Sequence, residues 1–580
     1  MYQRSFVFGK IFKNDSITIT KNDSYSSSTG YGFLTENVRQ KNELLQIPEI
    51  NNGFHLSPEY LDGVFPDDTA IMDDDIGCYL KDIKVLKNVP LTFKADVPKE
   101  GNYLVHLKIT ASHKGSDNIF LFSQCRRLML KKRSMKPGQS FRIDFVVNAC
   151  PIIPDSKAVS YSNNSINITL IGEHIALTEL TIEETNVPTI YLAGNSTVTD
   201  QIGSYPYDPA TCYCGWGQVL PAFLNSKVAV SNHAHSGFTT EAFRQKGHFQ
   251  IILDRIKPKD FFFMQFGHND QKLTHLAAFG GYADQLRRFI HEIKAKGAYP
   301  ILVTPIARNT WNGGNGTYLD LLQEYADVCI KIGREEHIPV LDLHRDSLKS
   351  LTSHGLEASK VYFYPGDYTH TNDYGALKMA GYIVKEFQKI PALASFTKEK
   401  LIPHIPKNLQ APGPSSVSLA MGPIPTNYQD IDSCYNKNII KLLGSLGILP
   451  NDEYFHPDEY LKRIEAIEMV SHTANYFITN DHNDHFHDIP IESTISGIAC
   501  CACAYGIIDQ ALIRDNYFLP QKRVTYKELL SFCVNAYRSR YDNHSFVMQE
   551  LADDSTPLEE ELLRYEAVDM IYRLRKLMLR

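Results

Sequence analysis

The sequence predicts three parts in series: an antiparallel β-sandwich over residues 1–185, a three-layer α/β domain over 186–392 and, after a linker over 393–428, a helical repeat region over 429–580. Three observations predict this order. The first part has short alternating runs without helical periodicity, the second alternates strands with helices, and the third repeats itself. A chain of 580 residues is too long for one hydrophobic core, so several domains are expected.

Composition and charge narrow the class of protein. The net charge is −7 and 43% of the residues are hydrophobic. A mildly acidic chain without basic runs argues against nucleic acid or an anionic membrane as a partner. No apolar run is long enough to cross a membrane, and residues 1–10 lack the apolar core of a secretory signal.

Cysteine usage bears on the compartment. There are 11 cysteines, an odd number, and Cys500, Cys501 and Cys503 stand too close together to make good disulfide partners. They are typical of small buried side chains that stay reduced. We therefore expect a cytoplasmic protein, with the cell surface as the alternative if a signal has been removed.

The first part contains strand-like runs such as residues 103–109 and 141–147, and turn clusters such as 98–102 separate these runs. This spacing is typical of a β-sandwich. Such a domain could bind sugar on an edge or concave face, or it could be a scaffold packed on its neighbour.

The middle part alternates buried strands with amphipathic helices. Apolar runs at 189–193, 261–266 and 300–305 predict strands, and apolar residues at helical spacing over 283–296 predict a helix between the last two. This rhythm predicts a parallel sheet covered by helices on both faces.

The last part repeats a spacing. A phenylalanine, a proline and a glutamate recur at the same offsets in 447–465 and 506–528, and 463–469 is echoed partially by 564–570. Repeats of this length predict helical units that bury their faces on one another.

Four polar blocks in the middle part lie at the ends of predicted strands or in the loops that follow: 194–196, 232–239, 267–270 and 367–370. In open α/β sheets the carboxyl ends of the strands are where ligands bind. Taken singly, each block has an ordinary explanation as a helix cap, a turn or a loop that bonds its own backbone. Their occurrence together, each at a strand end, favours a catalytic site.

The residue types in these blocks suit acyl transfer. Ser196 can attack a carbonyl if an imidazole takes its proton, and His370 is the candidate base. Asp367, three residues earlier, can hold that imidazole in one tautomer. The backbone N–H groups of Ser196 and Gly237 and the side-chain amide of Asn269 could stabilise the oxyanion.

These blocks resemble those of the SGNH (GDSL-like) hydrolases, most closely the rhamnogalacturonan acetylesterase branch, with further support from residues 192–201 and 215–218. The resemblance implies a flavodoxin-like SGNH fold that hydrolyses esters on carbohydrates, typically acetyl groups on pectic sugars. It assigns Ser196 as nucleophile, His370 as base and Asp367 as its orienting group. Gly237 and Asn269 complete the oxyanion hole, and neither metal nor cofactor is needed.

Two positions depart from the family pattern. Asn195 stands where the family usually has aspartate, and Phe238-Thr239 stands where it usually has Arg-Ser. We expect Asn195 to alter the hydrogen bonds of the nucleophile loop without removing the triad. Phe238 replaces a cation with an apolar ring, so we expect an altered substrate preference.

The flanking parts carry weaker resemblances. Residues 30–33 and 126–130 resemble a galactose-binding-like β-sandwich. The C-terminal echoes resemble S-layer homology repeats, which implies binding of a cell-wall polymer, or only a structural or self-associating role. The second copy has 524–528 without the arginine that this family pattern expects.

Three further signals are considered, and none is assigned a chemical role. His482, His485 and His487 lie among aspartates, a pattern that invites a metal, but a solvated loop between repeats explains it better, and no metal is predicted. Cys212 and Cys214 lack a second pair, so they indicate neither zinc nor redox chemistry. Trp216 could pack near the nucleophile, stack on a sugar ring or belong to the core.

The sequence thus predicts a serine carbohydrate esterase whose partner is an acetylated carbohydrate. One alternative keeps the mechanism and changes the substrate to another acyl ester, such as acetylated xylan or a lipid. The other is a glycan-binding or wall-associated protein whose hydrolase core has lapsed.

Overall fold

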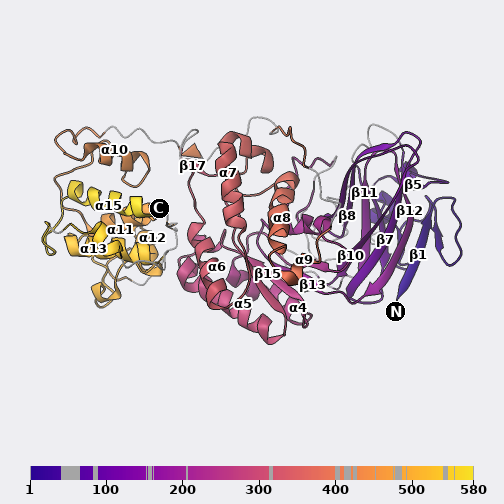
Figure 1. The fold of residues 1–580 in the computed structure, drawn as a ribbon, viewed down its shortest axis with the longest axis horizontal. Coiled ribbons are helices and arrows are strands. Elements are labelled where there is room, and N and C mark those ends of the chain that lie inside the picture. The colour runs from indigo at the N-terminus through magenta and orange to yellow at the C-terminus, as the bar shows by residue number, and fades with distance from the viewer. Residues whose placement is uncertain are drawn as a thin grey trace.

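The computed structural model arranges the described parts of the chain in a row, with N-terminal sheets, a central α/β domain and C-terminal helices (Figure 1). The structure describes residues 2–578 apart from 41–65, 82–88, 152, 154–159, 161, 163, 204–206, 313–317, 399–404, 411–419, 422–427, 451, 475, 477, 479–485, 491–492, 540–545 and 554.

The N-terminal part consists of two sheets that share one core. The first contains, in order, β10 (Ser140–Ala149), β7 (Gly101–Ala111), β12 (Ile175–Thr185), β1 (Gln3–Phe8) and β2 (Ile17–Ile19), with β5 (Gly77–Leu80) on β12 and β4 (Ile71–Asp74) on β5. The second contains β3 (Tyr31–Phe33), β6 (Leu91–Asp96), β11 (Ser165–Ile171), β8 (Ser116–Ser123) and β9 (Arg127–Met135).

The pairing in these sheets is antiparallel apart from β1 with β2. The two predicted runs at 103–109 and 141–147 fall in β7 and β10, which pair with Tyr103 opposite Val147. Side chains from both sheets, among them Phe8 and Phe93, fill the core between them. The prediction of an antiparallel β region is confirmed.

The central part contains a parallel sheet of β14 (Ala229–Asn232), β13 (Thr189–Gly194), β15 (Phe261–Gln265), β16 (Tyr299–Val303) and β18 (Val340–Leu341), in that spatial order. Numbered along the chain, this is the order 2-1-3-4-5 of a doubly wound sheet, whose switch point lies between the first and third strands. Those two strands are β13, which ends at the first residue of the block at 194–196, and β15, which ends two residues before the block at 267–270. The predicted parallel α/β architecture is confirmed.

Helices cover both faces of this sheet because alternate strand side chains point to opposite faces. Tyr191 and Ala193 face α4 (His248–Leu253), α5 (Ala283–Ala295) and α6 (Gln323–Glu335), whereas Ile190 and Leu192 face α2 (Trp216–Val219) and α8 (Asp373–Phe387). The remaining helices of this part are α3 (Thr240–Gln245), α7 (Leu343–Ser359) and α9 (Pro391–Ala394).

The C-terminal part is helical, as predicted, with α10 (Lys437–Ser445), α11 (Arg463–Thr473), α12 (Thr494–Ala504), α13 (Tyr526–Arg538), α14 (Val547–Leu551) and α15 (Arg564–Met578). The sequence echoes fall at the first turns of α11, α13 and α15. In each, a glutamate side chain accepts the backbone N–H three residues earlier: Glu465 from Lys462 (2.9 Å), Glu528 from Thr525 (3.3 Å) and Glu566 from Leu563 (2.9 Å).

Ion pairs join these three helix starts to one another. Arg463 contacts Glu528 at 2.9 Å and Arg564 contacts Glu465 at 2.6 Å, both largely buried. The second copy has Tyr526 at the equivalent position, so it has no arginine with which to make a third link.

The C-terminal helices pack directly on the central domain. Buried apolar residues of α5 and α6 and of the C-terminal helices belong to one continuous core. At the junction the Tyr505 hydroxyl donates to Glu324 of α6 at 3.2 Å. Of the predicted linker 393–428, only part is described, and there β19 (Ala420–Met421) pairs with β17 (Trp311–Asn312). No helix in the described ranges is long and apolar enough to cross a membrane.

Candidate active site

Ser196, His370 and Asp367 lie together at the carboxyl edge of the central sheet. Ser196 follows β13 by two residues, and His370 precedes α8 by three. Although 174 residues separate them in the chain, the Ser196 Oγ and His370 Nε2 atoms are 2.8 Å apart. The other ring nitrogen, Nδ1, is 2.7 Å from Oδ2 of Asp367. The predicted three residues therefore form a continuous hydrogen-bonded chain.

A tight turn fixes Asp367 beneath the imidazole. Its Oδ1 atom accepts the backbone N–H groups of Thr369 (2.7 Å) and His370 (3.0 Å). Burial by itself would raise the pKa of Asp367, but the hydrogen bond and charge of His370 and these backbone donors bring the pKa below its usual value. The carboxylate is therefore ionised at neutral pH.

The nucleophile loop is organised by the oxygen atoms of Asn195. Its buried Oδ1 accepts the backbone N–H of Thr197 at 3.1 Å and the Thr197 hydroxyl at 2.9 Å. Its Nδ2 atom is buried and has no hydrogen-bond partner within the described residues. Asparagine at this position therefore keeps the turn that presents Ser196, and only the oxygen of its side chain contributes to that turn.

Two backbone donors predicted for the oxyanion hole are unused. Within the part of the chain that the structure describes, the N–H groups of Ser196 and Gly237 donate to no protein acceptor. Gly237 has φ +80°, in the left-handed region that favours glycine. Gln201 links the two loops, because its Nε2 donates to the Ser196 carbonyl at 3.0 Å and to the Ser236 hydroxyl at 3.3 Å.

Asn269 lies against the same loop from the neighbouring strand. Its Nδ2 donates to the Phe238 carbonyl at 3.1 Å, and its Oδ1 accepts from Lys272 Nζ at 3.0 Å. The Phe238 ring points to a cluster of rings, stacked on His235 at 4.5 Å and edge-on to His248 at 4.9 Å. The structure thus brings all five predicted site residues to one end of the sheet.

Sequence reasoning gave Asp270 no role, although it stands within a named block. Asp270 is fully buried and accepts the backbone N–H of Thr240 (2.8 Å), the Thr240 hydroxyl (2.7 Å) and the backbone N–H of Gly267 (2.9 Å). It ties the Asn269 loop to the start of α3, three residues after Gly237. The signal available in the sequence was an aspartate that follows a predicted strand and a glycine.

Trp216 belongs to the core. It is 1% exposed, and its indole N–H donates to Gln265 Oε1 at 2.8 Å, while Gln265 Nε2 donates to the Thr197 hydroxyl at 2.6 Å. Of the three roles open for Trp216, the structure shows core packing close to the nucleophile loop, and its burial excludes stacking on a sugar ring.

Aromatic rings and cations lie on either side of the dyad formed by Ser196 and His370. Neither group was predicted from the sequence. The Tyr213 ring lies edge-on to His370 with centroids 5.6 Å apart and stacks on Tyr364 at 3.7 Å. On another side, Arg308 donates to the His268 carbonyl at 3.0 Å, and Lys272 bonds Asn269. Burial lowers the pKa of both cations, and the charge of Arg308 lowers the pKa of Lys272 further. Within the described ranges neither cation forms an ion pair with a carboxylate.

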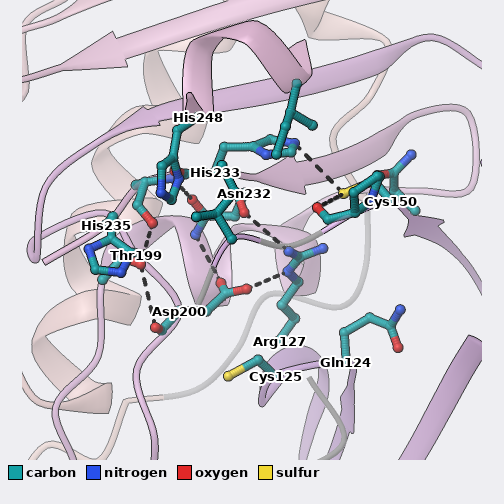
Figure 2. A pocket seen from close by; sticks show the side chains of 15 residues that line it. Gln124, Cys125, Arg127, Cys150, Thr199, Asp200, Asn232, His233, His235 and His248 are labelled. Atoms are coloured by element: carbon teal, nitrogen blue, oxygen red, sulfur yellow. Dashed lines mark hydrogen bonds and ion pairs between the residues drawn. The ribbon is translucent and has the colours of Figure 1, made fainter. Parts of the chain in front are cut away.

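A separate cavity of about 90 Å³ lies between the N-terminal sheets and the central domain (Figure 2). Cys150, His233 and His248 line it, whereas Ser196 and His370 do not. Burial lowers the pKa of His233 well below its usual range and that of His248 to about 4, and burial raises the pKa of the Cys150 thiol. These groups are therefore neutral at pH 7 and offer no activated nucleophile.

The structure describes the cysteines noted in the sequence and only part of the histidine cluster. All eleven thiols are free, and Cys212 and Cys214 are buried. Among the described residues no group of three or more potential ligands could hold a metal ion. His482 and His485 lie outside the described residues, and the neighbouring Asp488 accepts the backbone N–H groups of Phe518 (2.9 Å) and Leu519 (2.7 Å).

A doubly wound sheet with a serine, an imidazole and a carboxylate aligned at its carboxyl edge is the arrangement of a serine hydrolase with a flavodoxin-like fold. The chain belongs to the GDSL-like lipase/acylhydrolase family, whose model matches residues 192–377. It is 34% identical over 221 residues to the probable rhamnogalacturonan acetylesterase YesY of Bacillus subtilis, covering 36% of this chain and 98% of that protein.

Two further relatives come from the same organism. The chain is 31% identical over 214 residues to the rhamnogalacturonan acetylesterase RhgT of Bacillus subtilis, covering 35% of this chain and 90% of that protein. The crystal structure of YxiM from Bacillus subtilis aligns with 67% of this chain and 100% of its own, at 24% identity and a TM-score of 0.35. The galactose-binding-like and S-layer-homology-like resemblances of the flanking parts stay predictions.

Proposed function

We propose that this protein is a serine esterase that removes acetyl groups from acidic, pectic poly- or oligosaccharides. The observation that carries the proposal is the 2.8 Å contact between Ser196 Oγ and His370 Nε2, with Asp367 behind the imidazole and two unused backbone N–H groups beside the serine. This is the arrangement that acyl transfer through a serine needs.

The proposed reaction follows from the positions of these atoms. Neutral His370 takes the Ser196 proton as Oγ attacks the acetyl carbonyl, and Asp367 stabilises the imidazolium that forms. The oxyanion accepts hydrogen bonds from the N–H groups of Ser196 and Gly237 and from the Asn269 amide. His370 then protonates the departing sugar oxygen. A water molecule, deprotonated by His370, attacks the acetyl-serine and releases acetate.

Two features beside the dyad support an acidic sugar as substrate. The cations Lys272 and Arg308 lie beside Asn269 and form no ion pair within the described ranges, although the Asp367 charge acts on Arg308, so a substrate carboxylate would meet positive charge there. The half-buried pair Tyr213 and Tyr364 offers an aromatic surface to a sugar ring. The similarity to YesY, a probable rhamnogalacturonan acetylesterase, and to RhgT, a rhamnogalacturonan acetylesterase, favours the same class of substrate.

The proposal is tested by acetate release from acetylated rhamnogalacturonan oligosaccharides, acetylated xylo-oligosaccharides and longer-chain aryl esters. We expect the acidic oligosaccharides to give the highest kcat/KM, and Lys272→Gln to lower kcat/KM for them more than for a neutral aryl acetate. Faster turnover of xylan or long-chain esters would select the alternative substrates.

The nucleophile is tested in the same assays. We expect Ser196→Ala to lower kcat by at least about 10³-fold with the fold intact. Ser226→Ala, a serine in a surface turn of the same domain, is the matched control and should leave kcat unchanged. Wild-type turnover by Ser196→Ala would contradict the assignment, and retention of glycans without any ester hydrolysis by the wild type would favour a binding protein.

A further inference from the structure

Two consecutive arginines of the N-terminal sheets reach into the central domain. Arg126 ends the turn between β8 and β9 with φ +51°, and Arg127 begins β9. Both are buried, at 1% and 8% exposure. Strand β9 packs against α2 of the central domain, so this turn carries two guanidinium groups across the boundary between the two parts.

Arg126 holds the segment that carries His370. Its Nη1 atom contacts both carboxylate oxygens of Asp373, at 2.8 and 2.6 Å, and Asp373 is the first residue of α8, three residues after His370. Its Nη2 donates to the carbonyl of Tyr213, the residue whose ring lies edge-on to His370. Its Nε donates to the Gln201 carbonyl at 3.3 Å.

Both members of the Arg126–Asp373 pair are nearly inaccessible to solvent. Burial by itself would lower the pKa of Arg126, but the Asp373 charge raises the pKa well above its usual value, so the guanidinium stays charged.

Arg127 holds the segment that carries Ser196. Its Nε donates to Asp200 Oδ2 at 2.7 Å, four residues after Ser196. The other guanidinium nitrogens donate to the carbonyls of Val230 (3.3 Å) and Asn232 (3.4 Å) at the end of β14. Asp200 Oδ1 accepts from Asn232 Nδ2 at 2.9 Å. Figure 2 shows Arg127 between Asp200 and Asn232, joining the nucleophile loop to the strand that leads to Gly237.

We infer that Arg126 and Arg127 are positioning residues of the esterase site, through which the N-terminal sheets align His370 with Ser196. The inference rests on the proposed function. One turn supplies both contacts, so it fixes the distance between two segments that are remote in sequence. On this account the N-terminal part does more than pack against the catalytic domain, because its arginines help to position the catalytic residues.

A merely structural role is the competing explanation, and energetics weigh against it. Buried ion pairs give little net stability compared with apolar residues of similar volume, because both charges lose their hydration. What such pairs do supply is fixed geometry. In this case each pair ends within four residues of one member of the dyad, and a displacement of about 1 Å between reacting groups can cost about 100-fold in rate.

The test uses the full chain and removes each charge pair as a unit, so that no buried charge is left unpaired. The variants are Arg127→Gln with Asp200→Asn, and Arg126→Gln with Asp373→Asn. Arg142→Gln is the matched control, because Arg142 lies in the same sheets and pairs with Glu179 at 3.1 Å on the surface, with 67% of its side chain exposed. Single Arg→Lys variants keep the charge but lose the forked geometry.

Three quantities are measured: kcat and KM for an aryl acetate, the rate of Ser196 labelling by a fluorophosphonate, and the melting temperature. We expect kcat and the labelling rate of the paired variants to fall together by about 10- to 100-fold at temperatures where they are fully folded. KM should stay within about two-fold, and Arg142→Gln should match the wild type in all three. The Lys variants should fall between the wild type and the paired variants.

If the paired variants are folded and have the kcat and labelling rate of the wild type, the inference is overturned. It is also overturned if the loss of kcat is no larger than the fraction of variant molecules that are unfolded. If a paired variant does not fold, the Lys variants decide, and wild-type kcat in both would overturn it. Absence of labelling in the wild type would instead refute the proposed function, and this inference with it. A labelled wild type with unaffected variants refutes this inference alone.

Discussion

Replacing Asp367 with asparagine tests whether the carboxylate sets the tautomer of His370. The amide oxygen of asparagine can still accept the N–H groups of Thr369 and His370, now at 2.7 and 3.0 Å, so the turn should survive. The amide nitrogen would face His370 Nδ1, now 2.7 Å from Oδ2. Two donors cannot pair, so the ring proton moves to Nε2 and the base that faces Ser196 is lost.

The expected cost is large for catalysis and small for stability. The wrong tautomer lowers kcat by about 10⁴-fold, equivalent to about 5 kcal/mol of transition-state stabilisation. The contact between His370 and Asp367 is partly exposed, with 32% of the His370 side chain and 19% of the Asp367 side chain accessible, so the loss in free energy of unfolding should be only about 1 kcal/mol.

That stability difference has a defined pH dependence. The folded-state pKa of Asp367 is lowered, so its contribution is present above the unfolded pKa of about 3.9 and is lost as the pH falls through the folded value. The free energies of unfolding of the wild type and Asp367→Asn, measured in urea, should therefore converge once the pH falls below the folded-state pKa of Asp367.

The assay is initial-rate hydrolysis of an aryl acetate at pH 7, with circular dichroism to check the fold. Asp67→Asn is the matched control, because Asp67 accepts the backbone N–H of Thr69 at 2.8 Å in a similar turn but forms no hydrogen bond with an imidazole among the described residues. A loss below about 10-fold in folded Asp367→Asn, or an equal loss in the control, would refute the reasoning.

Two further changes probe other parts of the central domain. Asn269→Ala removes a proposed oxyanion donor and should lower kcat for an aryl acetate by about 10²–10³-fold, or 3–4 kcal/mol, with little change in KM; an unchanged kcat would exclude Asn269 from the oxyanion hole. Buried His344 has Asp320 Oδ2 2.9 Å from Nε2 and the Pro305 carbonyl 3.0 Å from Nδ1. Burial by itself would lower the pKa of His344, but the Asp320 charge raises it. The stabilisation is full below the unfolded pKa of about 6.5 and is lost as the pH rises through the folded value. His344→Gln should therefore lower the free energy of unfolding by about 3 kcal/mol at pH 6 and by less at pH 9, as measured in urea, and an equal loss at both pH values would contradict this.

Asn195, where the family pattern leads us to expect aspartate, still supports the turn that presents Ser196. The oxygen atoms of Asn195 form the turn, and an aspartate would offer the same acceptors. Its Nδ2 has no partner among the described residues, and a buried donor without an acceptor costs about 1–3 kcal/mol. The loop keeps the Ser196–His370 contact in spite of this cost.

Local pattern was sufficient for much of the molecule. Runs of apolar residues predict which strands are buried, and apolar residues at helical spacing predict which face of a helix is buried. The parallel strands and α5 were therefore predictable within a few residues, as the predicted helix at 283–296 and the observed Ala283–Ala295 illustrate. The chemistry of Ser196, Asp367 and His370 was also predictable, because few residue types can perform acyl transfer and parallel strands bring their carboxyl ends to one edge.

Only the tertiary structure decided which groups meet across long separations. Nothing local in the sequence indicates that Arg126 pairs with Asp373, 247 residues away, or that Tyr505 reaches Glu324 across the junction with the C-terminal helices. Periodicity encodes whether a side chain is buried, but not which side chain lies opposite. The partner of a buried charge is set by how the domains pack, and in this protein that packing determines what surrounds the active site.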